Sequence, residues 1–170
     1  MWIKEIDNVE IEVEFLTDNA TRHRKAKNVK LSGIVAQPLS YLSLSLQETL
    51  PFSIHSGERG RVASPAAWVF HKGLSFLRRK AKSKRHKDLY GVWYVLTQLN
   101  ALSQNAIHEL YRLGTTHPKW FKTFRRNLSQ WINQATPIDW AELETQDPKG
   151  LLKQLPFTHI MKSMKIIEMN

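Results

Sequence analysis

The sequence contains no cysteine among its 170 residues. Disulfides, thiolate metal sites and cysteine nucleophiles are therefore excluded. It also lacks any apolar run approaching the roughly 20 residues that a membrane-spanning helix requires. The charged start, Met1–Asp7, is not typical of a signal peptide. We therefore expect a cytoplasmic protein with no membrane partner.

Acidic residues are few. Asp and Glu number 15 against 25 Lys and Arg, which gives a formal net charge of +10. An excess of this sign favours polyanionic partners through phosphate contacts and counterion release, although a basic composition can also serve solubility alone. Nucleic acid or a nucleotide is therefore the first expected partner.

Hydrolase motifs are missing too. Ser64, Ser75 and Ser103 lack the Gly-x-Ser-x-Gly context that places a serine nucleophile on a strand-to-helix turn. Glu10, Glu12 and Glu14 alternate along one strand face, and this pattern is more typical of a solvated sheet face than of a metal cluster. Nucleophilic catalysis therefore has no support in the sequence.

The first third of the chain has the patterns of strands. Apolar residues alternate strictly with glutamate, which indicates a half-buried strand, and a turn-like segment rich in Gly and Ser predicts a hairpin. The expected strands are residues 9–15, 29–36, 39–46, 52–54 and 61–63. A charged loop is expected over residues 21–30, where apolar residues are almost absent.

The remainder has the patterns of helices. Ser64-Pro65 is typical of an N-cap followed by proline at the first helical position. A second helix is expected from about Lys87 to Leu99, joined to the first by a basic loop. Ser103 is the expected cap of a third helix, Pro118 opens a fourth, and short helices are expected after residues 137 and 148. The tryptophans on these helices recur at helical spacing and are expected in the core.

These patterns predict an α+β fold in one compact unit. A small mixed or antiparallel sheet over residues 1–64 is followed by a helical bundle over residues 65–170 that packs on it.

Four short motifs occur in a recognisable order: Val13–Thr17, Ala36–Leu39, Phe70-His71-Lys72 and Lys87-Asp88-Leu89. This order resembles nucleotidyltransferase-like proteins related to the abortive-infection nucleotidyltransferase toxins. The resemblance implies a partial nucleotidyltransferase fold and nucleotidyl transfer from a nucleoside triphosphate. It also implies two Mg²⁺ ions held by three carboxylates.

In the complete family, two of those carboxylates come from an Asp-x-Asp motif preceded by Gly-Ser. This sequence contains neither motif, and Glu14 stands where the family usually has an Asp as the third metal ligand. The chain is therefore expected to be a C-terminal portion that is inactive alone. Its expected partners are an N-terminal catalytic chain or an antitoxin. A non-catalytic nucleic-acid-binding module and an interaction subunit of a separate catalytic chain remain as alternatives.

The resemblance assigns catalytic roles to Glu14, Lys72 and Asp88, and nucleotide binding to Lys72, Arg78 and Lys87. Lys72 and Asp88 are expected to meet on one side of a cleft that faces Glu14. Simpler interpretations stay open: Lys72 as a solvated helix lysine and Asp88 as a residue that interacts with the helix dipole. For His71, simple packing is favoured over a ligand role.

A run of basic residues near position 80 predicts a nucleic-acid contact, with RNA such as tRNA as the expected ligand. Its members are Arg79, Lys80, Lys82, Lys84 and Arg85. A second basic patch consists of Lys119, Lys122, Arg125 and Arg126. The alternative interpretation of both is a solvated charged face.

Overall fold

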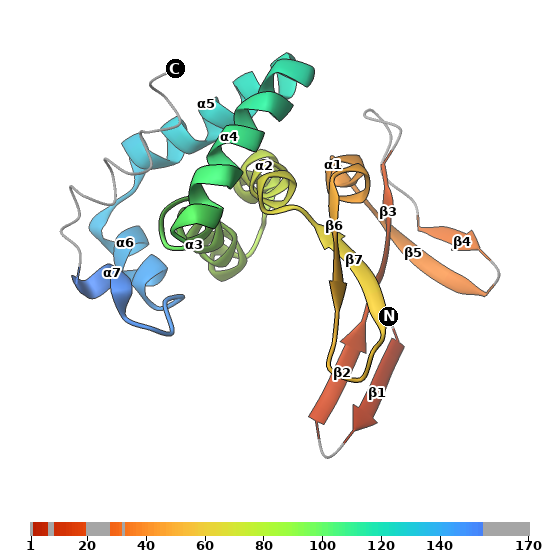
Figure 1. Ribbon diagram of the computed structural model, residues 1–170. Coiled ribbons are helices and arrows are strands. Elements are labelled where there is room, and N and C mark those ends of the chain that lie inside the picture. Colours follow the sequence, from red (N-terminus) through yellow and green to blue (C-terminus); the bar gives the residue numbers. More distant parts are fainter. Residues whose placement is uncertain (1, 7–8, 20–27, 32, 155–170) are drawn as a thin grey trace.

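The structure is a computed structural model that describes residues 2–6, 9–19, 28–31 and 33–154. All the described strands lie before residue 64, and all the described helices except one short one follow it (Figure 1). The α+β prediction is therefore confirmed. The charged loop expected over residues 21–30 lies mostly outside the described residues.

The strands form three small sheets. β1 (Trp2–Ile6) and β2 (Val9–Val13) make an antiparallel hairpin. β3 (Phe15–Asp18) runs parallel to β5 (Ile34–Leu39), which pairs antiparallel with β4 (Val29–Leu31). β6 (Thr49–Ser53) and β7 (Arg59–Ala63) form the expected hairpin. Only the second sheet contains a parallel pair among the described strands.

Two expected strands are each divided in the structure. The run 9–15 breaks at Glu14, so that β2 and β3 belong to different sheets. The run 29–36 turns back on itself as β4 and β5, with Gly33 between them at φ 81°. This left-handed conformation favours glycine, which has no Cβ to clash.

The strand predicted over residues 39–46 is wrong, because residues 42–47 form the short helix α1 (Leu42–Gln47). Leu42 and Leu44 are buried, whereas Leu46 is 60% exposed. The carboxylate of Asp18, at the end of β3, accepts a hydrogen bond from Ser43 N at 3.0 Å and so stabilises the start of this helix. A contact 25 residues away in sequence cannot be inferred from the local alternation of Leu and Ser.

The helical region begins where the sequence predicts. Ser64 Oγ accepts a hydrogen bond from Ala67 N at 3.2 Å and caps α2. The elements of this region are α2 (Pro65–Ser75), η1 (Phe76–Arg78), α3 (Lys82–Thr97), α4 (Ala101–Thr116), α5 (Pro118–Gln134), α6 (Pro137–Glu144) and α7 (Leu151–Gln154). None of the helices in the described part of the chain combines the length and the apolar character needed to cross a bilayer.

Two helix starts differ from the prediction. α3 begins at Lys82 rather than near Lys87, so the basic loop shrinks to the few residues after η1. The N-cap of α4 is Asn100, not Ser103. The Ser103 hydroxyl instead accepts from Leu99 N at 2.9 Å and donates to Val95 O at 2.7 Å. It therefore ties the end of α3 to the start of α4.

The core lies between α2 and the helices around it. The ring of Phe70 on α2 makes edge-to-face contacts with Phe121 and Phe124 of α5, at centroid distances of 5.9 and 5.5 Å. A Cβ at Gly73 would clash with the Phe124 ring, so this glycine is what lets α5 approach α2 closely. Trp93 and Trp131 are buried in the same core, as expected, and Trp120, also expected there, is partly buried against it.

Asn127 joins α5 to the end of α2. Its buried Nδ2 donates to Gly73 O at 3.1 Å and to Leu74 O at 3.2 Å. Carbonyls in the last turn of a helix lack the usual partner four residues on, so this amide satisfies groups that the helix itself leaves open.

We predict that Asn127→Ala lowers the free energy of unfolding by about 1–3 kcal/mol, since it removes a donor from buried carbonyls. Chemical denaturation measures the change. Asn133→Ala, an exposed position of the same helix, is the control and should shift stability by less than about 0.5 kcal/mol. Equal effects at both positions would contradict the role given to Asn127.

Candidate functional site

A pocket of about 240 Å³ opens where the parallel strands β3 and β5 end. Carboxyl ends of parallel strands are the usual place for ligands in α/β sheets, because the chain leaves there in loops that can turn toward a ligand. The strand ends and α2 supply its walls, and basic side chains from the segment after α2 border it. The lining residues are Asn19, Pro38, Leu39, Ser40, His71, Ser75, Arg78 and Arg79.

Beside this pocket, the carboxylate of Asp88 holds two cations. Lys72 Nζ lies 2.8 Å from Asp88 Oδ1, and Arg79 Nε donates to Asp88 Oδ2 at 3.0 Å. The side chain of Asp88 is 10% exposed and that of Lys72 is 19% exposed. Lys72 Nζ also lies 5.6 Å from the centroid of the Trp68 ring, in cation–π contact. The three charges therefore form a half-buried network with one net positive charge.

The expected meeting of Lys72 and Asp88 is thus present, and the helix boundaries explain it. Because α3 begins at Lys82, Asp88 lies in its second turn rather than at its start. The short link after η1 brings this turn back beside α2. A Cβ at Gly91 would clash with the Trp68 ring, so Gly91 lets α3 pack closely against α2. Asp88 is buried and does not lie in the first turn of α3. Because the helix dipole acts mainly on charges in the first turn, Asp88 is not a residue that compensates this dipole.

His71 is buried beside this network and lines the pocket. Burial lowers its pKa from 6.5 to about 4, and the charges of Lys72 and Arg79 also lower it, against the opposing effect of Asp88. Its Nδ1 lies 3.3 Å from Ser45 Oγ of α1. At neutral pH, His71 is therefore an uncharged group that connects α1 to the pocket wall.

The structure does not bring Glu14 to this network. Glu14 is exposed and precedes β3, whereas the pocket lies at the other end of that strand, after Asp18. Four residues of extended chain separate Glu14 from Asp18, a distance of about 13 Å. Glu14 lines a different pocket of about 190 Å³ with Phe15, Asn28, Val35 and Gln37. Its role as a metal ligand stays a prediction.

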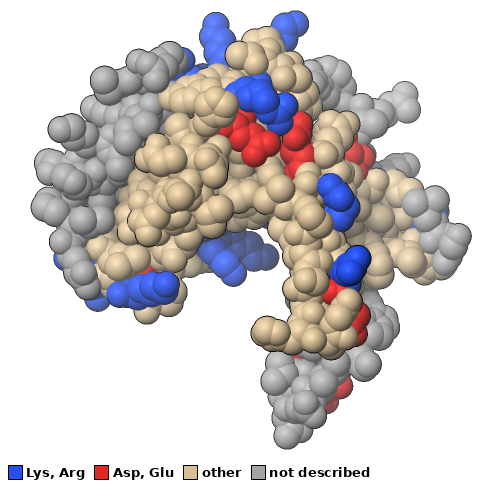
Figure 2. Space-filling model, in the orientation of Figure 1, with Lys and Arg blue, Asp and Glu red and all other residues tan. Residues whose placement is uncertain are grey.

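The other basic residues differ in their surroundings. Arg78 stacks over the Tyr41 ring at 5.5 Å and donates to its hydroxyl at 3.3 Å. Arg85 is half-buried and donates to Arg79 O at 3.3 Å. The remaining members of the basic run are exposed, as are most of the second patch: Lys80, Lys82, Lys84, Lys87, Lys119, Lys122 and Arg126. On the face shown in Figure 2, basic side chains are scattered over the surface rather than gathered in one patch.

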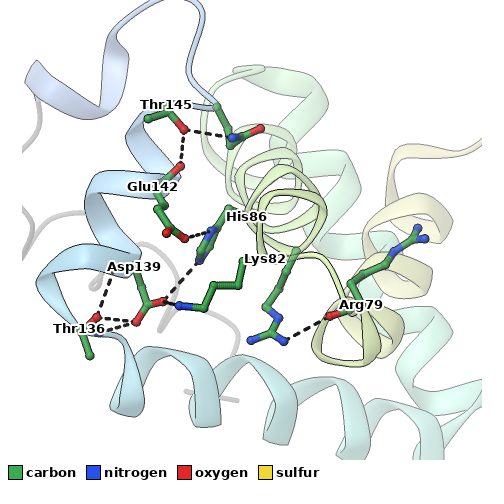
Figure 3. Close-up of polar contacts among 9 residues, drawn as sticks. Arg79, Lys82, His86, Thr136, Asp139, Glu142 and Thr145 are labelled. Atoms are coloured by element: carbon green, nitrogen blue, oxygen red, sulfur yellow. Dashed lines mark hydrogen bonds and ion pairs between the residues drawn. The ribbon is translucent and has the colours of Figure 1, made fainter.

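A second cluster of polar groups lies where α6 packs on α3, and the sequence did not point to it. His86, Asp139 and Glu142 each offer a ligand atom, and these atoms lie within 4.8 Å of one another (Figure 3). Burial lowers the pKa of His86 despite both nearby carboxylates, and hydrogen bonds from Thr136 lower the pKa of Asp139. The Asp-x-x-Glu spacing on α6 was the available signal, since residues three apart share a helix face.

The sequence also missed Asn19, Ser40 and Ser75, which line the pocket from strand ends and α2. Their position would follow only from knowing that β3 and β5 run parallel. In chemical terms, the pocket presents cations and a neutral histidine, which suits an anionic ligand such as phosphate. Among the described residues, no cluster of three ligating carboxylates borders it.

Comparison with known proteins gives one match. A family model described as "Nucleotidyltransferase" matches residues 2–113, which span the three sheets and the helices up to α4. The match therefore includes both the strand ends and the helices that build the pocket. No curated protein and no solved structure matches the chain significantly.

We predict that His71 makes stability depend on pH. Its pKa in the folded chain, about 4, lies below the value of 6.5 that it has when unfolded, so below pH 6.5 the unfolded chain binds more protons. Stability supplied by neutral His71 is complete above pH 6.5 and is lost as the pH falls toward 4, by up to about 3 kcal/mol.

The measurement is urea unfolding between about pH 7 and pH 4.5 for the wild type and for His71→Gln. The variant should lose less stability than the wild type over this range. His108→Gln, at an exposed position on α4, is the control and should follow the wild type. An unchanged pH dependence in His71→Gln would refute the assignment.

Proposed function

The chain belongs to the nucleotidyltransferase family, and on that basis we propose that its basic pocket binds the triphosphate of a nucleoside triphosphate. Lys72 and Arg79 are the principal contacts, with Arg78 and Lys87 as outer ones. The family supports the ligand class, and the geometry of the pocket supports the proposed place.

The observation that carries this proposal is the network centred on Asp88. Lys72 and Arg79 come from separate segments, and both contact the carboxylate of Asp88. Arg79 lines the pocket at the parallel strand ends, and Lys72 follows His71, which also lines it. Cations oriented in this way contribute more to phosphate binding than flexible surface lysines, because less side-chain entropy is lost on binding. Asp88 neutralises only one of the two charges, so a net attraction for phosphate remains.

We further propose that the chain alone does not transfer nucleotides. Nucleotidyl transfer in this family requires carboxylates that hold divalent cations, and the sequence contains no Asp-x-Asp motif. Glu14 would supply the one remaining ligand. The Mg²⁺ ions would then bind only after a segment carrying the missing carboxylates has joined this one.

β3 is the place proposed for that segment. It is the edge strand of its sheet, and among the described strands it pairs only with β5. Phe15 and Leu16 point to opposite faces of the sheet, yet each is 42% exposed. An added strand and helix would cover both apolar side chains and bring new carboxylates to the edge next to Glu14. A separate chain that carries the missing carboxylates is the proposed occupant.

The test is calorimetric titration with ATP and the other nucleoside triphosphates. We predict that Lys72→Gln and Arg79→Gln each weaken binding by about ten- to a hundredfold, because each removes a charge-assisted hydrogen bond to phosphate. Lys153→Gln removes one positive charge from an exposed position on α7 and is the matched control.

Circular dichroism should show that all three variants are folded, and Arg79, being more exposed than Lys72, is the safer of the two substitutions. The same preparations, incubated with labelled triphosphate, Mg²⁺ and total RNA, should incorporate no label. Equal nucleotide affinity in the wild type and Arg79→Gln would disprove the binding site. Incorporation that is abolished in Glu14→Ala would disprove the proposed dependence on a second segment.

A second candidate function is RNA binding by the start of α3. This helix has no side-chain cap and no acidic residue in its first turn, whereas basic residues gather there. Cations at a helix N-terminus oppose the helix dipole, each by about 0.3–1 kcal/mol, so their presence needs a compensating partner. A phosphate backbone is such a partner, and the acceptor strand of a nucleotidyl transfer would supply it.

We predict that replacing Lys80, Lys82, Lys84 and Arg85 with alanine weakens RNA binding and flattens its dependence on salt. The slope of log affinity against log salt should fall by about 0.7 for each phosphate of single-stranded RNA that the variant no longer neutralises. Fluorescence anisotropy over a range of salt concentrations measures both quantities. The control replaces four dispersed exposed basic residues, Lys30, Arg59, Lys149 and Lys153. Equal affinity and slope in the two variants would assign the basic run to a solvated face.

A further inference from the structure

The cluster at the contact between α3 and α6 has no place in the proposed nucleotide chemistry. Asp139 and Glu142 lie on one face of α6, and His86 of α3 lies between them (Figure 3). His86 Nδ1 is 3.1 Å from Glu142 Oε2, and His86 Nε2 is 3.8 Å from Asp139 Oδ1. His86 lies within the family match, whereas Asp139 and Glu142 lie beyond residue 113, where that match ends.

Two buried atoms of this cluster lack hydrogen bonds. His86 is 1% exposed, and its Nδ1 makes no hydrogen bond to any residue that the structure describes. The same holds for the buried atom Oε2 of Glu142, although it lies within hydrogen-bonding distance of that nitrogen. Buried polar atoms without partners are costly, and each such atom needs an explanation. A bound cation would coordinate both atoms at once.

The spacing suits a cation. Ligands about 2.1 Å from a tetrahedral zinc ion lie about 3.4 Å apart, and His86 Nδ1 and Glu142 Oε2, at 3.1 Å, are close to this spacing. Asp139 Oδ1 faces the other ring nitrogen, Nε2, at 3.8 Å, and one ligand atom from each of the three residues lies within 4.8 Å of the others. One imidazole nitrogen and two carboxylate oxygens are a donor set typical of zinc, with water completing the coordination.

The surrounding residues hold two of these groups in place. Thr136 donates to Asp139 Oδ2 from its backbone N at 2.9 Å and from its hydroxyl at 2.7 Å, which leaves Oδ1 directed toward His86. The His86 ring contacts Trp131 edge-to-face at 6.3 Å. Such fixation of the ligands by outer contacts is common in metal sites. Lys82 Nζ, 3.9 Å from Asp139 Oδ1, is the competing cation, but its side chain is 63% exposed and can move to solvent.

We infer that His86, Asp139 and Glu142 bind a divalent transition-metal ion, with Zn²⁺ as the best fit. The ion is structural: it holds α6 against α3 and so supports the helix that carries Asp88. The metal site is independent of nucleotide binding, because none of its three residues lines the pocket at the strand ends.

The test uses the whole chain after treatment with a chelator. Zn²⁺ titrated against a chromophoric chelator should bind with one ion per chain. At about a hundredfold excess over the dissociation constant, it should raise the melting temperature by about 5–10 °C. Co²⁺ in its place should give the visible absorption of a low-coordinate nitrogen–oxygen site. Mg²⁺ should have little effect, and an equal rise with Mg²⁺ would overturn the assignment to a transition metal.

Glu142→Gln removes one ligand at a partly exposed position and should weaken zinc binding at least about tenfold. Glu144→Gln, on the same helix but outside the cluster, is the matched control and should bind zinc as the wild type does. Circular dichroism checks that both variants fold. Absence of zinc binding by the wild type, or equal affinity in the two variants, would overturn the inference.

Discussion

The carboxylate of Asp88 is buried and therefore needs positive charge beside it. Two cations from different segments supply this charge, and their contacts with Asp88 organise the site. Lys72 of α2 and Arg79 of the following turn both lie within hydrogen-bonding distance of its oxygens. Removing either cation would leave the carboxylate less fully compensated in a poorly solvated place. The arrangement joins α2, the turn after it and α3, and the charges of Lys72 and Arg79 add to the burial that lowers the pKa of the neighbouring His71.

Local patterns were enough to predict some parts of the fold. Ser64-Pro65 identified the start of α2, and the glycine-containing turn identified the hairpin of β6 and β7. Prediction failed where the local structure depends on contacts between residues far apart in the sequence. α1 depends on a hydrogen bond to Asp18, and the early start of α3 could not be expected from residues whose charges oppose the helix dipole. Local propensity is a weak guide at such places because tertiary contacts override it.

For the site, the meeting of Lys72 and Asp88 was predicted from the resemblance to nucleotidyltransferase-like proteins. Helix packing alone did not predict it, because a helix beginning near Lys87 would place Asp88 at the far end of the helix pair, whereas α3 begins at Lys82. Asn19 and Ser40 could not be predicted, because their position depends on the parallel pairing of β3 with β5. The cluster around His86 was also missed, and its members on α3 and α6 lie about 50 residues apart in the chain. Short motifs are visible in a sequence, whereas sites assembled from distant elements need the fold first.

The close packing of α5 on α2 bears on the order in which the chain is made. α2 carries Lys72, and its inner face is covered by Phe124, Asn127 and Leu128 of a helix synthesised about 50 residues later. At about 5–20 residues per second, the ribosome needs on the order of 3 to 10 s to produce those residues. During translation, the part of the apolar face of α2 that α5 covers therefore stays open for seconds.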